Sequence, residues 1–255
     1  MIKIVAYMPV FNEADILPFS LAYLLSQGIS VHALENWSTD DSWEILSTTP
    51  GVKVERFPPD GPSKEYRYLD SLHRTEELAA QSGADWCMLN DADEWRSVML
   101  LTPSAQWMCP TLAEGTEIWD AKGFNAIDHR VMVFLPTDDD WDRQDPTKYF
   151  RHYTTDPAVN MLCGIPQVKT WKNVGRVDLA SSGGHDVRFT GRRICPEKFI
   201  LRHYPYMGGE RSKQKLRSRI ERRSPDEHRN GWSVQYDGFQ PDWNGLWKPE
   251  QLQCL

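Results

Sequence analysis

Two aspartates spaced one residue apart, Asp91 and Asp93, closely follow a short apolar run in this 255-residue chain. The run, 86–89, has no helical polar face and is short enough for a strand that is buried on both sides. The aspartates then lie just past the carboxyl end of that strand, where parallel α/β sheets hold their ligands. Two carboxylates at this spacing can bind one hard divalent cation, which commonly shares its oxygen ligands with phosphates. An isolated Asp-x-Asp is more often a polar turn that caps the next helix, so the rest of the chain has to decide between the two.

The residues before this motif alternate between predicted strands and helices. Apolar runs predict strands at 2–8, 29–34, 52–57 and 84–89, the first of them ended by Pro9. Helical spacing and capping residues predict helices from about residue 12 to Gly28, from about 38 to 46, and at 63–83. Strand and helix in this order, with short connections, imply a parallel sheet with right-handed crossovers.

The pattern is less regular after Glu94. Short strands are predicted at 131–134, 168–171, 177–180 and 200–204, with an acidic surface loop at 137–142 and a basic helix at about 210–223. The chain contains no internal repeat or clear boundary, so we expect one domain over 1–255 with an irregular C-terminal third.

Composition excludes several classes of protein. The formal charge of -7 argues against a general nucleic-acid binder, which would be expected to be basic. The five cysteines are odd in number and form no C-x-x-C pair, which fits reduced cytoplasmic thiols better than disulfides or a zinc site. Residues 1–11 are too short for a signal core and are interpreted as the first strand. No stretch is long and apolar enough to be a transmembrane segment.

Three motifs together resemble those of family 2 type glycosyltransferases of the GT-A fold. Members of that family have a strand ending in Pro-x-x-Asn-Glu, a second strand ending in an acidic residue followed by Asn-x-Ser-Thr-Asp, and a later Asp-x-Asp. This chain has them in the same order and at similar spacing, at 9–13, 35–40 and 91–93. Pieces at 184–186, 202–205 and 231–237, and the basic helix, resemble a bacterial and phage branch of the family. The resemblance implies a Rossmann-like α/β fold with a mostly parallel sheet flanked by helices.

The resemblance also implies where a nucleotide-sugar donor would bind. It places the base and ribose at the loops after the first two strands, which hold Pro9, Asn12, Glu13 and Glu35. The two glutamates can accept hydrogen bonds from such groups, although helix capping and turn formation are alternative roles. Glu35 departs from the usual Asp of the family and reaches one methylene further. A donor-binding Arg often precedes the metal strand, and Arg74 is favoured over Arg67 for it, against the alternative of a solvated surface Arg.

Metal and phosphate binding would complete the donor site. Asp91 and Asp93 would hold Mn²⁺ or Mg²⁺ and, through it, the donor diphosphate. His203 follows another apolar run and would add an imidazole ligand, which suits Mn²⁺ better, or be a structural histidine. On the basic helix, Arg211 and Lys215 are the candidates for phosphate contacts. The same face of that helix could instead be solvated or meet anionic lipid.

Inverting transfer needs a general base for the acceptor hydroxyl. The resemblance implies an Asp or Glu about a hundred residues past the metal motif, which points to Asp186, and the glycines before it allow close approach of a substrate. This chain has His185 where many relatives have Glu, so a neutral imidazole is the alternative base, and a polar turn is the alternative for both residues.

The sequence therefore predicts a cytoplasmic, metal-dependent glycosyltransferase that moves a sugar from a UDP- or GDP-linked donor to a hydroxyl of a glycan, lipid-linked or protein acceptor. Residues 1–100 would form the donor half, and 101–255 the acceptor half with the basic helix. A nucleotidyltransferase is one alternative, although 9–15 contain none of the glycines of a phosphate loop. A non-catalytic protein of the same fold that binds nucleotide or sugar is the other.

Overall fold

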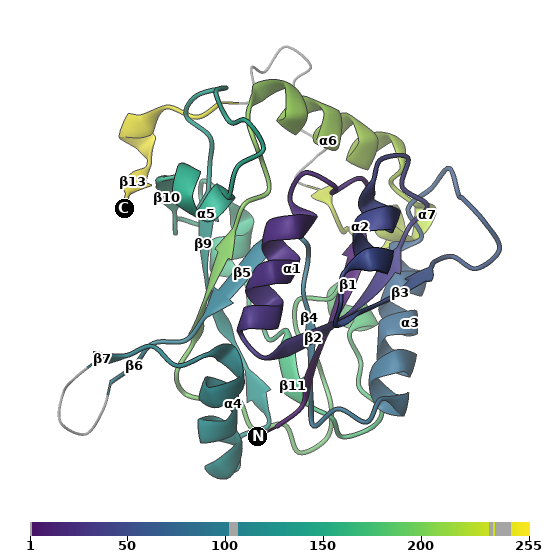
Figure 1. The fold of residues 1–255 in the computed structure, drawn as a ribbon, viewed down its shortest axis with the longest axis vertical. Helices are drawn as coiled ribbons and strands as arrows, with labels where there is room; N and C mark the ends of the chain where they lie inside the picture. Colours follow the sequence, from purple (N-terminus) through teal and green to yellow (C-terminus); the bar gives the residue numbers. More distant parts are fainter. Residues whose placement is uncertain (1, 102–106, 235–236, 238–245) are drawn as a thin grey trace.

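A six-stranded sheet forms the centre of the protein in a computed structural model that describes residues 2–101, 107–234, 237 and 246–255 (Figure 1). Its strand order is β3-β2-β1-β4-β11-β8. The strands are β1 Ile4–Val10, β2 Ile29–Glu35, β3 Val52–Arg56, β4 Trp86–Leu89, β8 Ala126–Ile127 and β11 Thr170–Lys172. Strands β1 to β4 are parallel, and β11 is antiparallel to both of its neighbours. The α/β fold with a mostly parallel sheet is confirmed.

Helices cover both faces of this sheet because both faces of its strands are apolar. Residues Ile4, Ala6 and Met8 of β1 pack into a cluster with leucines of α1 Leu17–Ser26 and α2 Ser42–Thr48. The alternate residue Tyr7 packs into a second cluster, which contains Leu72 and Ala79 of α3 Tyr68–Gln81. Burial on both sides explains the continuous apolar runs in the sequence.

The chain reverses its direction across the sheet between β1 and β4. It moves outward from β1 through β2 to β3 and then returns to place β4 on the other side of β1. The loops that follow β1 and β4 consequently leave the same edge of the sheet and diverge there. Such a switch point is where open α/β sheets bind ligands.

A second sheet of five strands has the order β13-β10-β9-β12-β5. Its strands are β5 Glu94–Ser97, β9 His129–Phe134, β10 His152–Thr154, β12 Phe199–His203 and β13 Gln253–Cys254. Strand β5 starts directly after Asp93, and its antiparallel register with β12 sets His203 opposite Glu94. The predicted strands at 131–134 and 200–204 are parts of β9 and β12.

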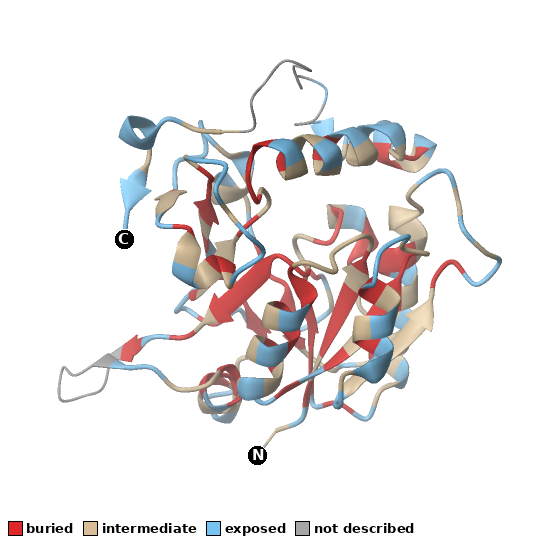
Figure 2. Ribbon diagram, turned by 45° about the horizontal axis from the view of Figure 1, so that its top comes forward, coloured by how far each residue is buried: buried red, intermediate tan, exposed pale blue. Residues whose placement is uncertain are grey.

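The remaining elements surround the two sheets. They are α4 Leu112–Ala121, α5 Pro146–Tyr149, α6 Gly209–Glu221, α7 Pro225–Arg229, the 3-10 helices η1 Met161–Gly164, η2 Ala180–Ser182 and η4 Pro249–Gln251, and the hairpin of β6 Leu100–Leu101 with β7 Trp107–Met108. Helix α6 crosses above α1 and α2, with one side exposed and the other turned toward the body of the protein (Figures 1 and 2). On the inner side Ser212 and Leu216 are buried. Within the ranges that the structure describes, no helix has the length and apolarity to cross a membrane.

Three predicted boundaries are corrected. Pro9 does not end β1 but lies inside it, because β4 pairs with β1 only as far as Tyr7 and leaves Pro9 a strand neighbour on one side only. The helix predicted at 63–83 starts at Tyr68, since Tyr66 donates its backbone N–H to the carbonyl of Arg222 instead. The predicted strand at 177–180 forms one bridge at Asp178 and then turns into η2.

Candidate active site

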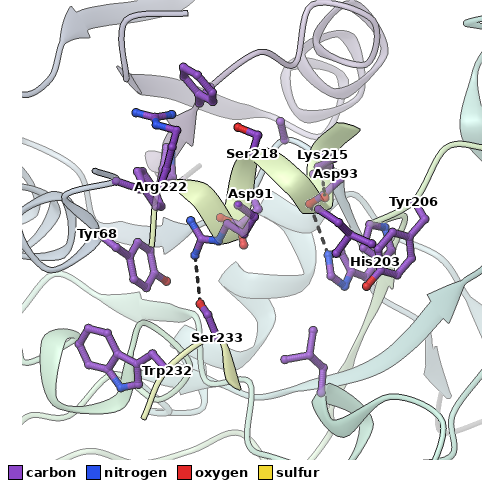
Figure 3. Close-up of a pocket in the computed structure, with 18 of the residues that line it drawn as sticks. Tyr68, Asp91, Asp93, His203, Tyr206, Lys215, Ser218, Arg222, Trp232 and Ser233 are labelled. Atoms are coloured by element: carbon purple, nitrogen blue, oxygen red, sulfur yellow. Dashed lines mark hydrogen bonds and ion pairs between the residues drawn. The ribbon is translucent and has the colours of Figure 1, made fainter. Parts of the chain in front are cut away.

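A pocket of about 420 Å³ lies at the switch point, with α6 along one side (Figure 3). Residues from the loops after β1 and β4, from 183–185, from the end of β12 and from α6 line it. The predicted residues among them are Pro9, Asn12, Glu13, Asp91, Asp93, His185, His203, Arg211 and Lys215. The folding of the chain thus brings together residues that are more than two hundred positions apart in sequence.

The loop after β1 is joined to the loop after β2 by side-chain hydrogen bonds. Asn12 has a left-handed backbone, with φ of 53°, a conformation that Asn tolerates better than most residues. Its backbone N–H donates to Ser38 Oγ at 2.9 Å, and its Oδ1 accepts from the N–H of Thr39 at 2.8 Å. The backbone N–H of Glu13 donates to Ser42 Oγ at 3.0 Å. These bonds fix the loop and leave the Glu13 carboxylate facing the pocket.

A buried charge network lies directly beneath the Asp91–Asp93 loop. Glu94 is 4% exposed, and its carboxylate accepts from Lys169 Nζ at 2.7 Å and from the Arg96 guanidinium at 2.6 Å. It also accepts the backbone N–H of Asp91 at 3.2 Å, which fixes the turn. Burial would raise the pKa of Glu94, but Lys169 and Arg96 outweigh this effect and lower the pKa to about 2. The loop that carries both aspartates is therefore supported by an ionised carboxylate.

Asp93 is held between the side chains of Lys215 and His203. Lys215 Nζ lies 2.8 Å from its Oδ2, and His203 Nε2 lies 3.4 Å from its Oδ1. Figure 3 shows Lys215 and His203 both beside Asp93. Burial would raise the pKa of Asp93, but Lys215 and His203 hold it far below its usual range. Asp93 is thus ionised.

The negative charge of Asp91 is offset less by neighbouring cations than that of Asp93. Its side chain is 43% exposed toward the pocket, and Lys169 Nζ is 3.4 Å from Oδ2. Burial, together with the nearby Glu94 and Asp93 carboxylates, raises the pKa of Asp91 against the opposing effect of Lys169. An added cation beside Asp91 would favour its ionised form.

These donors fit a divalent ion only in combination with another ligand. Within the described residues, no group of three or more acidic, histidine or cysteine side chains has the geometry of a metal site. Mg²⁺ and similar ions are, however, often held by one or two carboxylates with substrate phosphates completing the coordination. Asp91 and Asp93 match that donor set, and His203 Nδ1 is buried without a hydrogen-bond partner among the described residues. The residues present fit a metal that arrives with a phosphate ligand.

Helix α6 supplies cations that pair with the acidic side of the pocket. Lys215 Nζ is 2.9 Å from Glu13 Oε1, and Arg211 is 3.3 Å from Glu13 Oε2 and also pairs with Asp15. Burial and the neighbouring Asp93 raise the pKa of Glu13, and Lys215 and Arg211 offset part of this rise. The two predicted phosphate-binding cations are therefore engaged by carboxylates in this structure.

The other end of α6 forms a row of alternating guanidinium and aromatic groups that sequence reasoning missed. The guanidinium carbon of Arg222 is 3.6 Å from the ring centroid of Phe11 and 5.9 Å from that of Tyr66. The guanidinium carbon of Arg219 is 4.5 Å from the centroid of Tyr66 and 5.5 Å from that of Tyr68. Each contact of this kind stabilises the structure by about 0.5–2 kcal/mol, depending on solvation. The basic face of the helix was visible in the sequence, but the two tyrosines gave no signal beyond their type.

Trp232 was part of the resemblance and lines the same end of the pocket, edge-on to Tyr68. Gln235 and Tyr236 of the same motif lie outside the described residues.

Two expected donor contacts are corrected, because both side chains are satisfied elsewhere. Glu35 is fully buried, and its carboxylate accepts the backbone N–H groups of Trp37 at 3.1 Å and Ser38 at 2.6 Å and pairs with Arg56. The extra methylene of Glu thus turns the carboxylate back onto its own loop. Arg74 pairs with Glu55 at 2.7 Å and with Glu77 at 3.1 Å, and neither Glu35 nor Arg74 lines the pocket.

The two candidate bases are separated by the structure. The Asp186 carboxylate pairs with Arg192 and, at 3.4 Å, with Arg188, and it does not line the pocket. His185 does line it, and His185 Nδ1 lies 3.3 Å from Gln167 Oε1. Burial, together with the nearby Lys169, lowers the pKa of His185 to about 4, so that its imidazole is neutral at pH 7. Of the two candidate bases, His185 therefore faces the pocket in this structure, and the carboxylate of Asp186 does not.

Glycine at position 184 allows His185 to reach the pocket. Gly184 has φ of +83°, and a Cβ atom there would lie 2.8 Å from the Tyr68 hydroxyl and 2.9 Å from Leu89 Cδ2. Both the backbone conformation and the close approach disfavour any residue with a Cβ atom at this position.

Comparisons with known proteins give fold-level likeness at low similarity. No family model matches the sequence, and no curated protein matches it. Among solved structures, the chain is similar to residues 1–349 of TarS from S. aureus, with 11% identity, a TM-score of 0.43, and coverage of 86% of this chain and 65% of that one. It is also similar to mannosyl-3-phosphoglycerate synthase from Rubrobacter xylanophilus, with 16% identity, a TM-score of 0.36, and coverage of 68% of this chain and 54% of that one.

Both solved structures are glycosyltransferases. This chain spans less than two thirds of the length of either.

Proposed function

We propose that this protein is a glycosyltransferase that moves a sugar from a nucleotide-sugar donor to a hydroxyl acceptor. The observation that carries the proposal is the meeting of Asp91 and Asp93 with Arg211 and Lys215 in one pocket at the switch point of the sheet. Carboxylates that can hold a divalent ion, next to cations that can hold phosphate oxygens, complement a metal-bound diphosphate. A UDP- or GDP-linked sugar carries that group between its base and its sugar.

The residues of the site divide naturally between the parts of such a donor. The nucleoside would bind at the loop of Pro9, Asn12 and Glu13, which is hydrogen-bonded to the loop after β2. Asp91 and Asp93 would hold Mn²⁺ or Mg²⁺, with His203 beside them, and Arg211 and Lys215 would bind the phosphates. When bound, the metal would offset the charge that develops on the diphosphate as the glycosidic bond breaks.

His185 is proposed as the general base. Its neutral imidazole accepts the proton of the acceptor hydroxyl as that oxygen attacks the anomeric carbon. The bond from the anomeric carbon to the diphosphate oxygen breaks on the opposite side, which inverts the configuration and releases a nucleoside diphosphate. Lys215 and Arg211 would stabilise the negative charge of that leaving group.

The acceptor side of the pocket is less polar. Met161, Leu162 and Tyr206 line it. Apolar and aromatic groups suit the less polar faces of a sugar, so we propose a hydroxyl of a glycan, of a lipid-linked sugar or of a glycosylated protein as acceptor.

The test is incubation of the protein with a panel of nucleotide sugars and Mn²⁺, with release of nucleoside diphosphate as the readout. We expect release from one donor class, increased by a suitable acceptor, and its loss in Asp93→Asn. Asp142→Asn, an exposed residue outside the pocket, is the matched control and should behave as the unmodified protein. Release of pyrophosphate from nucleoside triphosphates would indicate a nucleotidyltransferase instead, and binding without release would indicate a non-catalytic protein.

A further inference from the structure

The ammonium group of Lys215 pairs with the carboxylate of Asp93, on which metal binding would depend. The ammonium lies 2.8 Å from Asp93 Oδ2, and the other oxygen of Asp93 faces His203 at 3.4 Å. Asp93 is only 6% exposed. A cation that approaches Asp93 Oδ2 is repelled by the Lys215 ammonium and competes with it for the lone pairs of that oxygen, as long as Lys215 stays where it is.

Two carboxylates also hold Lys215 where it lies as long as no further cation enters the pocket. It bridges Asp93 and Glu13, at 2.8 and 2.9 Å, and so separates two carboxylates that would otherwise repel each other. Burial would lower the pKa of Lys215, but Asp93 and Glu13 raise it above its usual value. The ammonium is therefore charged and acts as the resident cation of the site.

A diphosphate would change this balance. It brings negative oxygens that can take both Lys215 and Arg211 as partners, and this frees Asp93 for a metal. A metal without diphosphate would add two positive charges next to Lys215 and Arg211, whereas a metal with diphosphate would not.

The start of α6 permits such an exchange of partners. Gly208 precedes the helix with φ of +106°, and the backbone N–H of Gly209 donates to Asp139. The exchange needs only the long, flexible side chains of Lys215 and Arg211 to turn from the carboxylates to the phosphate oxygens, while the contacts of Arg219 and Arg222 hold the other end of the helix.

We propose that Lys215 makes metal binding conditional on the diphosphate: it closes the metal site at Asp93 until a nucleoside diphosphate group draws it away, so that metal and diphosphate bind as a pair. This inference rests on the proposed function for the identity of the ligand. It predicts positive coupling between the two ligands, which must be equal in both directions.

The test measures Mn²⁺ binding, by electron paramagnetic resonance of free Mn²⁺ and by calorimetry, with and without UDP and GDP. The unmodified protein should bind Mn²⁺ alone weakly, and at least tenfold more tightly with the matching nucleotide. Lys215→Met should bind Mn²⁺ alone at least tenfold more tightly than the unmodified protein and should lose most of the gain from nucleotide. Lys215→Arg, which keeps the charge, should retain the coupling.

Two controls assign the effect to Asp93. Lys213→Met removes a cation of the same helix that pairs only weakly with Glu210, at 3.6 Å, and does not line the pocket, so it should leave Mn²⁺ binding unchanged. Adding Asp93→Asn to Lys215→Met should abolish the gained Mn²⁺ affinity.

Equal affinity of the unmodified protein and Lys215→Met for Mn²⁺ alone, whether strong, weak or undetectable, overturns the inference. Absence of binding by every nucleotide overturns the proposed function instead, and the comparison with Mn²⁺ alone still decides the role of Lys215.

Discussion

Lys169 Nζ and Glu94 Oε1 lie 2.7 Å apart, and both residues are almost completely buried directly under the Asp91–Asp93 loop. Burial would lower the pKa of Lys169, but Glu94 and Asp91 outweigh it and raise the pKa. The pair thus places a permanent positive charge behind Asp91 and a permanent negative charge beneath the turn.

We therefore expect Lys169→Met to lower the free energy of unfolding by about 3–5 kcal/mol, since it leaves Glu94 buried with one of its two cations. Urea denaturation measures this change. The double variant Lys169→Met/Glu94→Gln should lose clearly less than the sum of the two single variants. Additive losses would show that the two charges do not depend on each other.

Substitution of the two candidate bases should separate their roles. His185→Gln should lower kcat by about 10²–10⁴ while nucleotide affinity is retained, because it removes a proton acceptor that does not contact the donor phosphates. Asp186→Asn should retain most activity, because its carboxylate faces Arg192 and Arg188 outside the pocket. Steady-state kinetics and calorimetry on both variants provide the measurement, and the opposite order of effects would return the role of base to Asp186.

The buried His129 should make stability depend on pH. Its Nδ1 lies 2.8 Å from the carbonyl oxygen of Gln167, and its Nε2 is buried without a hydrogen-bond partner in the described ranges. Burial, with a smaller effect of Arg96, lowers the pKa of His129 to about 3. The unfolded chain protonates this imidazole near pH 6.5, whereas the folded chain does not. His129 therefore destabilises the fold at low pH: this destabilisation is absent above pH 6.5 and grows as the pH falls toward 3.

Lowering the pH from 7.5 to 5.5 should thus cost the unmodified protein about 1.4 kcal/mol more than His129→Asn, whose amide can still donate to Gln167. Chemical denaturation of both proteins at the two pH values measures the difference. An equal loss in both proteins would show that His129 is protonated in the folded state.

Gly184→Ala should damage the site through both backbone and contacts. A backbone with φ of +83° costs a residue with Cβ about 1–2 kcal/mol, and the new methyl group would press on Tyr68 and Leu89. Gly191→Ala is the matched control, with φ of +77° and no atom within 4 Å of its Cβ position. We expect Gly184→Ala to lower Tm more than Gly191→Ala does. Equal decreases in Tm would show that a methyl group at position 184 does not clash with Tyr68 or Leu89.

The strands, the helices and the Asp-x-Asp motif of residues 2–93 could be predicted because the information for them is local. Apolar runs, helix starts and the Asp91–Asp93 pair each follow from a few neighbouring residues, and the parallel order follows from their alternation. The approach of His203 to Asp93 could be proposed because His203, like the aspartates, lies at the end of an apolar strand.

The errors arose where an ionic partner decides the position of a side chain. Glu35 turns toward Arg56 and Arg74 toward Glu55, and both of these partners lie on β3. Asp186 turns toward Arg192, six positions further along the same irregular segment. The tyrosines at 66 and 68 became part of the pocket because α6 returns over them more than 140 residues later, which no local pattern indicates.

The position of β5 gives the site a mechanical property. The chain leaves the six-stranded sheet at Leu89 and enters the five-stranded sheet at Glu94. Asp91 and Asp93 therefore lie on a short connection between the two sheets. A shift of one sheet against the other would displace the two ends of this connection and change the separation of the two carboxylates. Substitutions in the interface between the sheets, far from the pocket, would therefore change the affinity of the pocket for a ligand.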